Sequence, residues 1–331
     1  MSQPRIVVVG SYATGLTMRA ARIPGSGETL LGTGYRVDFG GKGSNQAVGA
    51  SRLGAQVDFV AKIGTDSFGD MALGLYREEN IATTFVQRIA DIPTGVGFIV
   101  VEASTGHNAI VIDPGANDLL GQSDVSAAKL AIDSASVVLT QLETPVAAAE
   151  TALSLGRAAG AATILNPAPV RPLADSVLSL IDILTPNETE ARILAGRPPD
   201  AHVEAETVAR ELLNRGVKQV VMTLGEKGAL LISSKSQKHF PAIKVQPVDT
   251  TGAGDSFNAG LAVALANGET LDEAISFAMI AGAMAVTKEG VIPSLPRRDE
   301  VLAFCKSREI EVPMWLESDS VHASQGSPHL I

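Results

Sequence analysis

Short β-branched runs alternate with helical patterns along most of this chain. Residues 6–9 form a run that ends at Gly10, and the run at 57–63 is followed by a helical pattern from Ser67. Further strand candidates lie at 137–141, before a helix that opens at Pro145, and at 162–165, 181–184 and 219–223. This alternation predicts βαβ units, which form a mostly parallel sheet flanked by helices. Ligands of such sheets bind at the carboxyl ends of the strands.

The size of the chain allows one large α/β domain or two smaller ones, because 331 residues with 45% apolar content can bury a large core. No tandem repeat or low-complexity linker divides the sequence, so we expect a single domain over residues 1–315. The composition becomes polar and unpatterned from Glu317 onward. This predicts a flexible tail at 316–331.

The charge and cysteine content narrow the possible functions. A net charge of −10 argues against nucleic-acid or anionic-membrane partners, which need a basic face. Cys305 is the single cysteine, which excludes an internal disulfide framework and suits a reducing compartment. No N-terminal leader pattern is present, and the longest apolar stretch, 277–286, is too short to span a bilayer. We therefore expect a cytoplasmic protein.

One segment, Asp249-Thr-Thr-Gly-Ala-Gly-Asp-Ser-Phe-Asn-Ala-Gly260, indicates a catalytic site. It follows an extended, β-rich run at 242–248 and opens into an apolar helical pattern at 254–266. Gly252 and Gly254 allow backbone N–H groups to face outward at the helix start, which is a ready anion site. Asp255 is the candidate general base, and we expect the helix dipole to favour its ionised form and keep its basicity low. The alternative is an ordinary acid at a helix start.

A second segment, Gly40-Gly-Lys-Gly-Ser-Asn-Gln-Ala47, is not a phosphate-binding P-loop, because Gly43 rather than Ser or Thr follows Lys42. The histidines lack metal-ligand spacing, and no G-x-S-x-G elbow is present. The two segments resemble, in order, the two signatures of the ribokinase (PfkB-type) carbohydrate kinases. The resemblance runs from Ile6 to about Arg308. It implies a ribokinase-like fold with a small β-sheet lid, formed by insertions at about 11–40 and 94–113.

The resemblance also implies a reaction and its residues. The reaction is transfer of the γ-phosphoryl group of Mg·ATP to a primary hydroxyl of a small sugar, with Asp255 as base. The implied site consists of an anion hole (Gly252, Ala253, Gly254), sugar contacts (Gly41, Lys42, Asn45, Glu143, Asp255), an N-x-x-E motif that organises water and Mg²⁺ (Asn187, Glu190), nucleotide contacts (Thr223, Gly225, Gly228) and a K⁺ site (Asp249, Thr251). Capping of a helix or turn is the alternative role for Glu143, Asn187 and Asp249.

One stretch departs from the family pattern. Ribokinases usually have the sequence Gly-Ser-x-Asn-x-Asp after the first strand. In this chain Ala13 stands at the asparagine position and Gly15 at the aspartate position. Thr14 points to the opposite face if the strand continues. The transfer machinery is complete while the acceptor site is altered, so fructose, another ketose or a nucleoside are alternative acceptors. A non-catalytic sugar- or nucleotide-binding regulator is a further alternative. The free edges of a lid sheet predict a homodimer through the lid strands.

Overall fold

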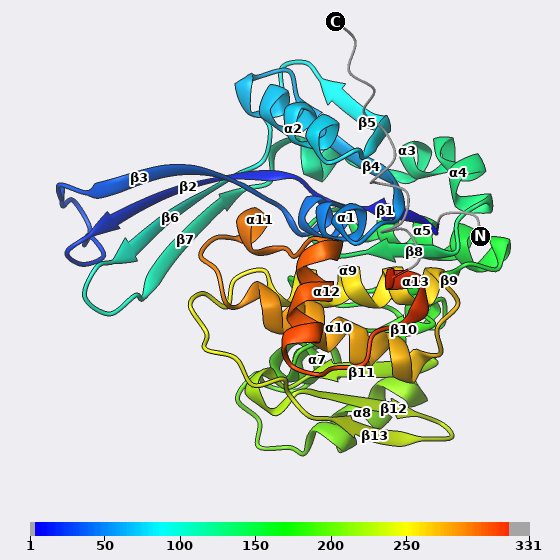
Figure 1. Cartoon of the computed structure of the whole chain (residues 1–331). Helices are drawn as coiled ribbons and strands as arrows, with labels where there is room; N and C mark the ends of the chain where they lie inside the picture. The colour runs from blue at the N-terminus through cyan, green and yellow to red at the C-terminus, as the bar shows by residue number, and fades with distance from the viewer. Residues whose placement is uncertain (1–3, 318–331) are drawn as a thin grey trace, which may run out of the picture.

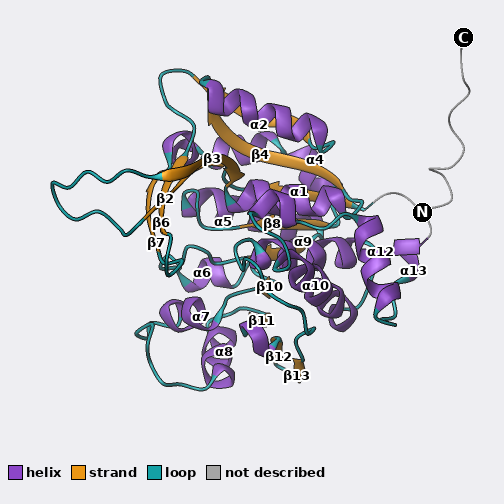
Figure 2. Cartoon of the chain, turned by 60° about the vertical axis from the view of Figure 1, so that its left-hand side comes forward, coloured by secondary structure: helices purple, strands orange, loops and turns teal. Residues whose placement is uncertain are grey.

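The computed structural model describes residues 4–317, and in this range the chain forms two β-sheets and a set of flanking helices (Figures 1 and 2). The large sheet has nine strands in the order β13-β12-β11-β10-β9-β8-β1-β4-β5. Neighbouring strands pair in parallel from β11 to β5, and β12 runs antiparallel to β11 and β13. Within this range, the helices are too short or too polar to cross a bilayer.

The strands of the large sheet are β1 (Arg5–Val9), β4 (Gln56–Gly64), β5 (Ala82–Ile89), β8 (Val137–Thr140), β9 (Ala162–Leu165), β10 (Ile183–Leu184), β11 (Gln219–Thr223), β12 (Ala229–Ser233) and β13 (Gln237–Phe240). The helices are α1 (Lys42–Arg52), α2 (Ser67–Glu78), α3 (Gln122–Ala127), α4 (Lys129–Asp133), α5 (Val146–Ala159), α6 (Asp175–Leu178), α7 (Glu188–Leu194), α8 (Ala205–Asn214), α9 (Ala253–Ala266), α10 (Leu271–Ala285), α11 (Val291–Ser294), α12 (Arg298–Ser307) and α13 (Met314–Glu317). Two 3₁₀ turns lie at Gly115–Leu119 and Gly225–Lys227.

Alternate residues of the central strand β1 point to opposite faces of the sheet, and both faces are covered. Ile6 and Val8 pack into the apolar core that contains residues of α1, α2, α9 and α10. Val7 and Val9 pack into a second core with residues of α3, α4 and α5. A strand that is buried on both sides requires a continuous apolar run, which is what the sequence at 6–9 provides.

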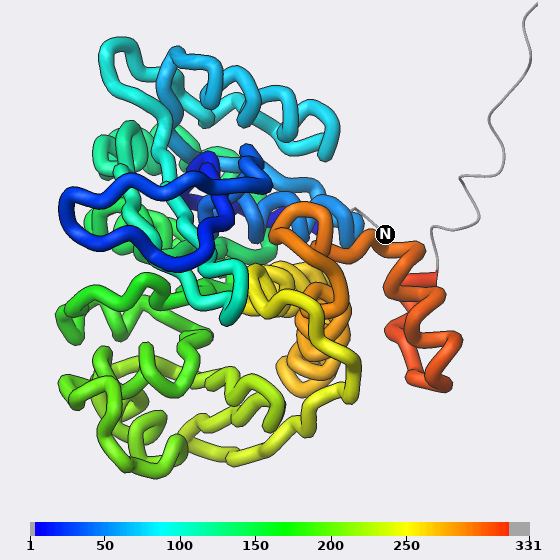
Figure 3. Tube along the Cα trace, turned by 90° about the vertical axis from the view of Figure 1, so that its left-hand side faces the viewer, coloured from blue at the N-terminus to red at the C-terminus, as the bar shows by residue number. Residues whose placement is uncertain are grey.

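The small sheet, called the lid below, contains β2 (Ala13–Ala20), β3 (Thr33–Gly40), β6 (Val96–Glu102) and β7 (Asn108–Asp113) in the order β3-β2-β6-β7. It projects from one side of the body, and Figure 3 views the molecule from that side. Two chain segments build it, one directly after β1 and one after β5. The lid therefore begins where the first strand of the large sheet ends.

The fold confirms the α/β class, the mostly parallel sheet and the small lid sheet. The strands β12 and β13, at one end of the large sheet, pair antiparallel to their neighbours, and the alternation of strands and helices did not indicate them. Two local expectations were wrong. The run at 242–248 is irregular rather than a strand. The predicted start of the flexible tail, residue 316, is too early in the chain, because Leu316 is fully buried in α13. The rest of that tail, 318–331, lies outside the described residues.

Candidate active site

A cavity of about 310 Å³ lies where the carboxyl ends of the central strands meet the start of α9. The residues after β9 and β10 contribute Asn166, Thr185 and Asn187, and the end of β11 contributes Thr223. The start of α1 contributes Lys42. Thr251, Gly252, Gly254 and Asp255 complete it from the other side. The fold thus brings the two sequence segments together, although Lys42 and Asp255 are far apart along the chain.

Asp255 lies in the first turn of α9 and is buried. Its Oδ2 accepts a hydrogen bond from Asn45 Nδ2 at 2.8 Å, and its Oδ1 accepts one from Gln46 Nε2 at 2.9 Å. Burial raises the pKa of Asp255 above its usual range, against the Lys42 charge and the two amide donors, which lower it. The expected low basicity was wrong, because desolvation of the carboxylate outweighs the Lys42 charge and the two amide donors.

The glycines before Asp255 adopt the geometry of an anion site. Gly252 is the N-cap of α9 with φ +83°, and Gly254 faces open space, because a methyl group there would meet no atom within 4 Å. Both residues line the cavity. The N–H of Ala253 donates to the carbonyl of Thr250 at 3.3 Å, so this amide is partly engaged within the turn. Gly252 and Gly254 therefore remain the better candidates for anion donors.

The Gly41–Asn45 segment lies close to Asp255, as the predicted sugar contacts require. Gly41 has φ +87°, and a methyl group there would lie 2.6 Å from Tyr12 Cα. Asn45 Oδ1 is a buried acceptor without a partner among the described residues. The carboxylate of Glu143 accepts from Ser11 Oγ at 2.5 Å and from the Lys42 N–H at 2.8 Å. Glu143 thus fixes the start of α1, a structural role beside the predicted sugar contact.

Lys42 is the cation of the cavity. Burial lowers the pKa of its ammonium, but the carboxylates of Asp255, Glu143 and Glu190 outweigh this effect and raise it above its usual value. Lys42 shares the cavity with Asn187, Glu190 and Thr223, which were predicted to contact the nucleotide. It therefore lies between the predicted sugar and nucleotide contacts, where it can interact with transferred phosphate.

Asn187 and Glu190 form a capping box at the start of α7. The Glu190 N–H donates to Asn187 Oδ1 at 2.8 Å, and the Asn187 N–H donates to Glu190 Oε2 at 2.9 Å. The second Glu190 oxygen takes no part in this box, and both residues line the cavity. Burial raises the pKa of Glu190, while the Asn187 N–H and the Lys42 charge lower it. The motif therefore caps a helix and still presents polar groups to the cavity.

The predicted nucleotide glycines lie beyond the cavity lining. Thr223 lines it, whereas Gly225 and Gly228 belong to the adjoining turn before β12. Gly228 has φ +101°, and a methyl group there would lie 1.9 Å from the Phe240 carbonyl oxygen. The backbone conformation thus requires glycine at position 228, whether or not this residue contacts a nucleotide.

The predicted K⁺ residues lie in a turn beside the cavity. Asp249 Oδ1 accepts from the Thr251 N–H at 2.9 Å, and its Oδ2 accepts from the Gly290 N–H at 3.0 Å. These bonds match the alternative role, a turn cap. Among residues 4–317, no group of three or more His, Cys, Asp or Glu side chains is arranged to hold a metal ion.

The altered residues of the lid lie on the face of the small sheet that also carries Arg36 and Asp38. Gly15 pairs with Asp38 of β3, and a methyl group at Gly15 would lie 3.8 Å from Asp38 Cβ. Arg36 lies on the same side of β3 as Asp38, and its Nη1 reaches Glu289 Oε1 on the body at 2.8 Å. Thr14 is buried on the other side beside the Tyr12 hydroxyl, at 3.2 Å, as predicted. Asp38 is therefore a lid carboxylate beside Gly15, which has no side chain of its own.

Sequence reasoning missed a layer of buried amides and hydroxyls below Asp255. Gln46 Nε2 also lies 3.2 Å from Asn166 Oδ1, and Gln46 Oε1 accepts from Gln141 Nε2 at 2.6 Å. Thr185 Oγ1 donates to Asn258 Oδ1 at 2.6 Å. Asn166 and Thr185 directly follow predicted strands, so the rule that ligands bind at strand ends could have found them. Gln46 was within the quoted segment but received no role.

Comparison with known proteins decides the family. The model of the pfkB family of carbohydrate kinases matches residues 3–298. The chain belongs to this family. A ribokinase from Haemophilus influenzae is 40% identical over 90% of this chain and 97% of the relative. A deoxyribokinase from Salmonella typhi is 35% identical over 92% of the chain and 99% of the relative.

Solved ribokinase structures agree with the fold. Arabidopsis thaliana ribokinase complexed with ribose and ATP has a TM-score of 0.84 at 32% identity, over 92% of this chain and 99% of that one. Ribokinase from Thermotoga maritima has a TM-score of 0.82 at 36% identity, also over 92% and 99%. The resemblance inferred from the two sequence segments is thereby confirmed.

Proposed function

We propose that this pfkB-family sugar kinase transfers the γ-phosphoryl group of ATP to a primary hydroxyl of a small sugar, with Asp255 as general base. The observation that carries the proposal is the buried Asp255 carboxylate, held by Asn45 and Gln46 in the cavity that Gly252 and Gly254 also line. A base beside an anion site is what phosphoryl transfer to an alcohol requires.

Each group has one task in this reaction. The acceptor hydroxyl oxygen forms a bond to the γ-phosphorus while the bond from that phosphorus to the β,γ-bridging oxygen breaks and ADP leaves. The proton of the hydroxyl passes to Asp255. The Gly252 and Gly254 amides and the Lys42 ammonium stabilise the negative charge on the phosphoryl oxygens. The raised pKa of Asp255 makes it a better proton acceptor than an exposed aspartate.

The ions belong to the same proposal. When bound, Mg²⁺ neutralises charge on the triphosphate, and Glu190 would hold it through water with its oxygen outside the capping box, since Mg²⁺ keeps several waters and few protein ligands. The Asp249–Thr251 turn fits K⁺ as an oxygen-rich turn beside the anion site, although both Asp249 oxygens already accept N–H groups.

The expected single domain over residues 1–315 and the expected cytoplasmic location of the protein stay predictions.

The acceptor is the open part of the function. Related proteins are a ribokinase and a deoxyribokinase, and this chain has Ala13 and Gly15 on the lid strand β2. We propose that Asp38 is the lid side chain that reaches the acceptor, because it lies beside position 15 on the same face. A panel of ribose, deoxyribose, fructose, other ketoses and nucleosides, assayed with ATP, identifies the acceptor. Binding of ATP without turnover of any acceptor would favour the regulator instead.

The first test is Asp255→Asn. This amide cannot take the proton, so we expect kcat to fall at least about 10²-fold while the acceptor Kd changes little. Coupled ADP release measures kcat, and calorimetric titration measures acceptor binding. Asp272→Asn, at an exposed aspartate that pairs with Lys238 away from the cavity, controls for the loss of one negative charge. Near wild-type turnover by the Asp255→Asn enzyme would refute the assignment of the base.

A further inference from the structure

Arg52 is a buried cation outside the cavity that the reaction proposed above does not use. It lies in the last turn of α1, the helix that begins at Lys42. Its Nη2 and Nε donate to the two carboxylate oxygens of Glu79, at 2.6 and 3.1 Å. The side chains of Arg52 and Glu79 are 10% and 6% exposed. Burial raises the pKa of Glu79, but Arg52 and Arg297 outweigh it and hold this pKa below its usual value, so the pair is charged.

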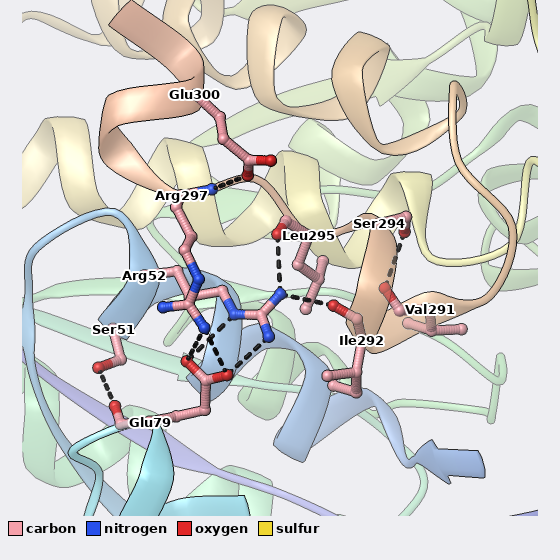
Figure 4. A network of polar contacts seen from close by, with 9 residues as sticks. All are labelled: Ser51, Arg52, Glu79, Val291, Ile292, Ser294, Leu295, Arg297 and Glu300. Carbon is pink, nitrogen blue, oxygen red and sulfur yellow. Dashed lines mark hydrogen bonds and ion pairs between the residues drawn. The ribbon is translucent and has the colours of Figure 1, made fainter.

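The remaining Arg52 nitrogen holds the short helix α11. Arg52 Nη1 donates to the carbonyl oxygen of Ile292 at 2.6 Å and to that of Leu295 at 2.9 Å (Figure 4). The guanidinium is planar with donors in a fixed fork, so binding Glu79 fixes the direction in which Nη1 points. α11 is only four residues long and has few internal hydrogen bonds. Arg52 therefore supplies the side-chain hydrogen bonds that hold α11, beside the burial of Ile292 and Leu295 in the core.

α11 in turn packs on the anion hole. Val291, its first residue, lies against Gly252, where a methyl group would come within 2.7 Å of Val291 Cγ1. The preceding residue, Gly290, donates its N–H to Asp249 Oδ2 at 3.0 Å. Residues 290 and 291 thus contact both ends of the 249–252 turn that leads into Asp255.

We propose that Arg52 is a positioning residue for phosphoryl transfer. Its fork anchors α11, and Val291 of α11 holds Gly252 at the geometry in which its amide faces the cavity. A preorganised anion hole lowers the barrier of the chemical step and contributes less to binding of the ground state. Loss of the anchor should therefore lower kcat and leave the KM values of ATP and acceptor nearly unchanged.

Arg297 offers a matched control, because it contacts the same carboxylate from the solvent side. Its Nη2 lies 3.0 Å from Glu79 Oε1, and its side chain is 53% exposed. Arg297→Met removes one cation beside Glu79 and leaves the bonds from Arg52 to α11 in place. Arg52→Met with Glu79→Met removes the anchor without leaving a buried carboxylate unpaired. Arg52→Lys keeps the positive charge but lacks the planar set of donors that binds Glu79 and α11 at the same time.

The three variants, R297M, R52M/E79M and R52K, are compared with the wild type by kcat, the KM values of ATP and acceptor, and thermal unfolding. We expect kcat to fall about 10- to 100-fold in R52M/E79M, with KM values within about threefold, because small misplacements of catalytic groups cost rates of this order. R52K should fall between this variant and wild type, and R297M should stay within about twofold. Equal kcat losses in R297M and R52M/E79M, or losses confined to KM, would overturn the proposal.

Val291→Ala tests the same link even if the Arg52 variants fold poorly. It removes the contact with Gly252 while Arg52 stays in place, so kcat should again fall with little change in KM. If Arg52 acts through Val291, the kcat losses of R52K and V291A should not add in the double variant. A V291A enzyme with wild-type kcat would contradict the inference. The inference about Arg52 rests on the proposed function. The wild-type enzyme must therefore first show turnover that Asp255→Asn abolishes. If it does not, the proposed function is wrong, and the role of Arg52 is not what has failed.

Discussion

At the residue scale, the catalytic region depends on the balance between one buried cation and three carboxylates. Asp255, Glu143 and Glu190 raise the pKa of Lys42, and the Lys42 charge lowers that of Asp255 and of Glu190. The net shift of Asp255 is still upward, because burial penalises its charged form. A base of this kind takes up its proton at a higher pH than an exposed aspartate does.

The first prediction concerns Lys42→Met. Removing this cation removes an influence that lowers the pKa of Asp255, so the pKa rises further. The ionised base is then lost at a higher pH as the solution is acidified. We expect the acid limb of kcat/KM against pH to move to higher pH, in addition to a lower maximum rate. The profile is measured for the acceptor at saturating ATP, where it reports groups of the enzyme before the acceptor binds.

Lys238→Met is the control for this titration. Lys238 is an exposed lysine on β13 that pairs with Asp272, away from the cavity. Its removal changes the net charge by the same amount and should leave the acid limb in place. An acid limb that stays fixed in the Lys42→Met enzyme, or moves to lower pH, would show that Lys42 does not act on Asp255.

At the scale of the element, the start of α9 allows the catalytic and structural roles of its glycines to be separated. Gly254→Ala places a methyl group in open space at the cavity, and alanine favours the helix by about 0.5–1 kcal/mol over glycine. We expect kcat to fall at least about 10-fold with unchanged or higher thermal stability. Gly252→Ala should lose activity and stability together, because φ is +83° and Val291 leaves no room.

These two variants are compared by kcat and by the midpoint of thermal unfolding. A Gly254→Ala enzyme with wild-type kcat would mean that the transferred phosphoryl group does not occupy the space beside Gly254. A Gly252→Ala enzyme as stable as wild type would mean that the turn tolerates the methyl group by shifting away from Val291.

Sequence patterns predicted the elements better than the environment of the residues they carry. The strands at 162–165 and 219–223 and the helix after Gly252 were predictable from apolar periodicity and glycine placement. The raised pKa of Asp255 was not, because its burial arises from α1 and the strand ends, which are distant in sequence. Likewise, the run at 242–248 has strand-like composition, but no neighbouring strand pairs with it.

At the scale of the whole molecule, the outer face of the lid is apolar and uncovered. Val37, Leu16, Phe98 and Val111 lie side by side, one on each of the four strands, on the side opposite Gly15 and Asp38. Phe98 is 54% exposed and Val111 is 71% exposed. β3 and β7 are also free edges of this sheet. An apolar row of this kind beside free edges favours association with a second copy of the chain.

The last prediction follows from this row. We expect the wild-type protein to be a homodimer through the lid at micromolar concentration, and Phe98→Asp to be a monomer, because a carboxylate in an apolar interface would lose its hydration without a partner. Light scattering during size-exclusion chromatography measures the mass. Leu130→Asp is the control, since Leu130 is exposed on α4 of the body and should not affect assembly. A monomeric wild type would exclude the lid dimer, and a dimeric Phe98→Asp protein would move the interface away from this face.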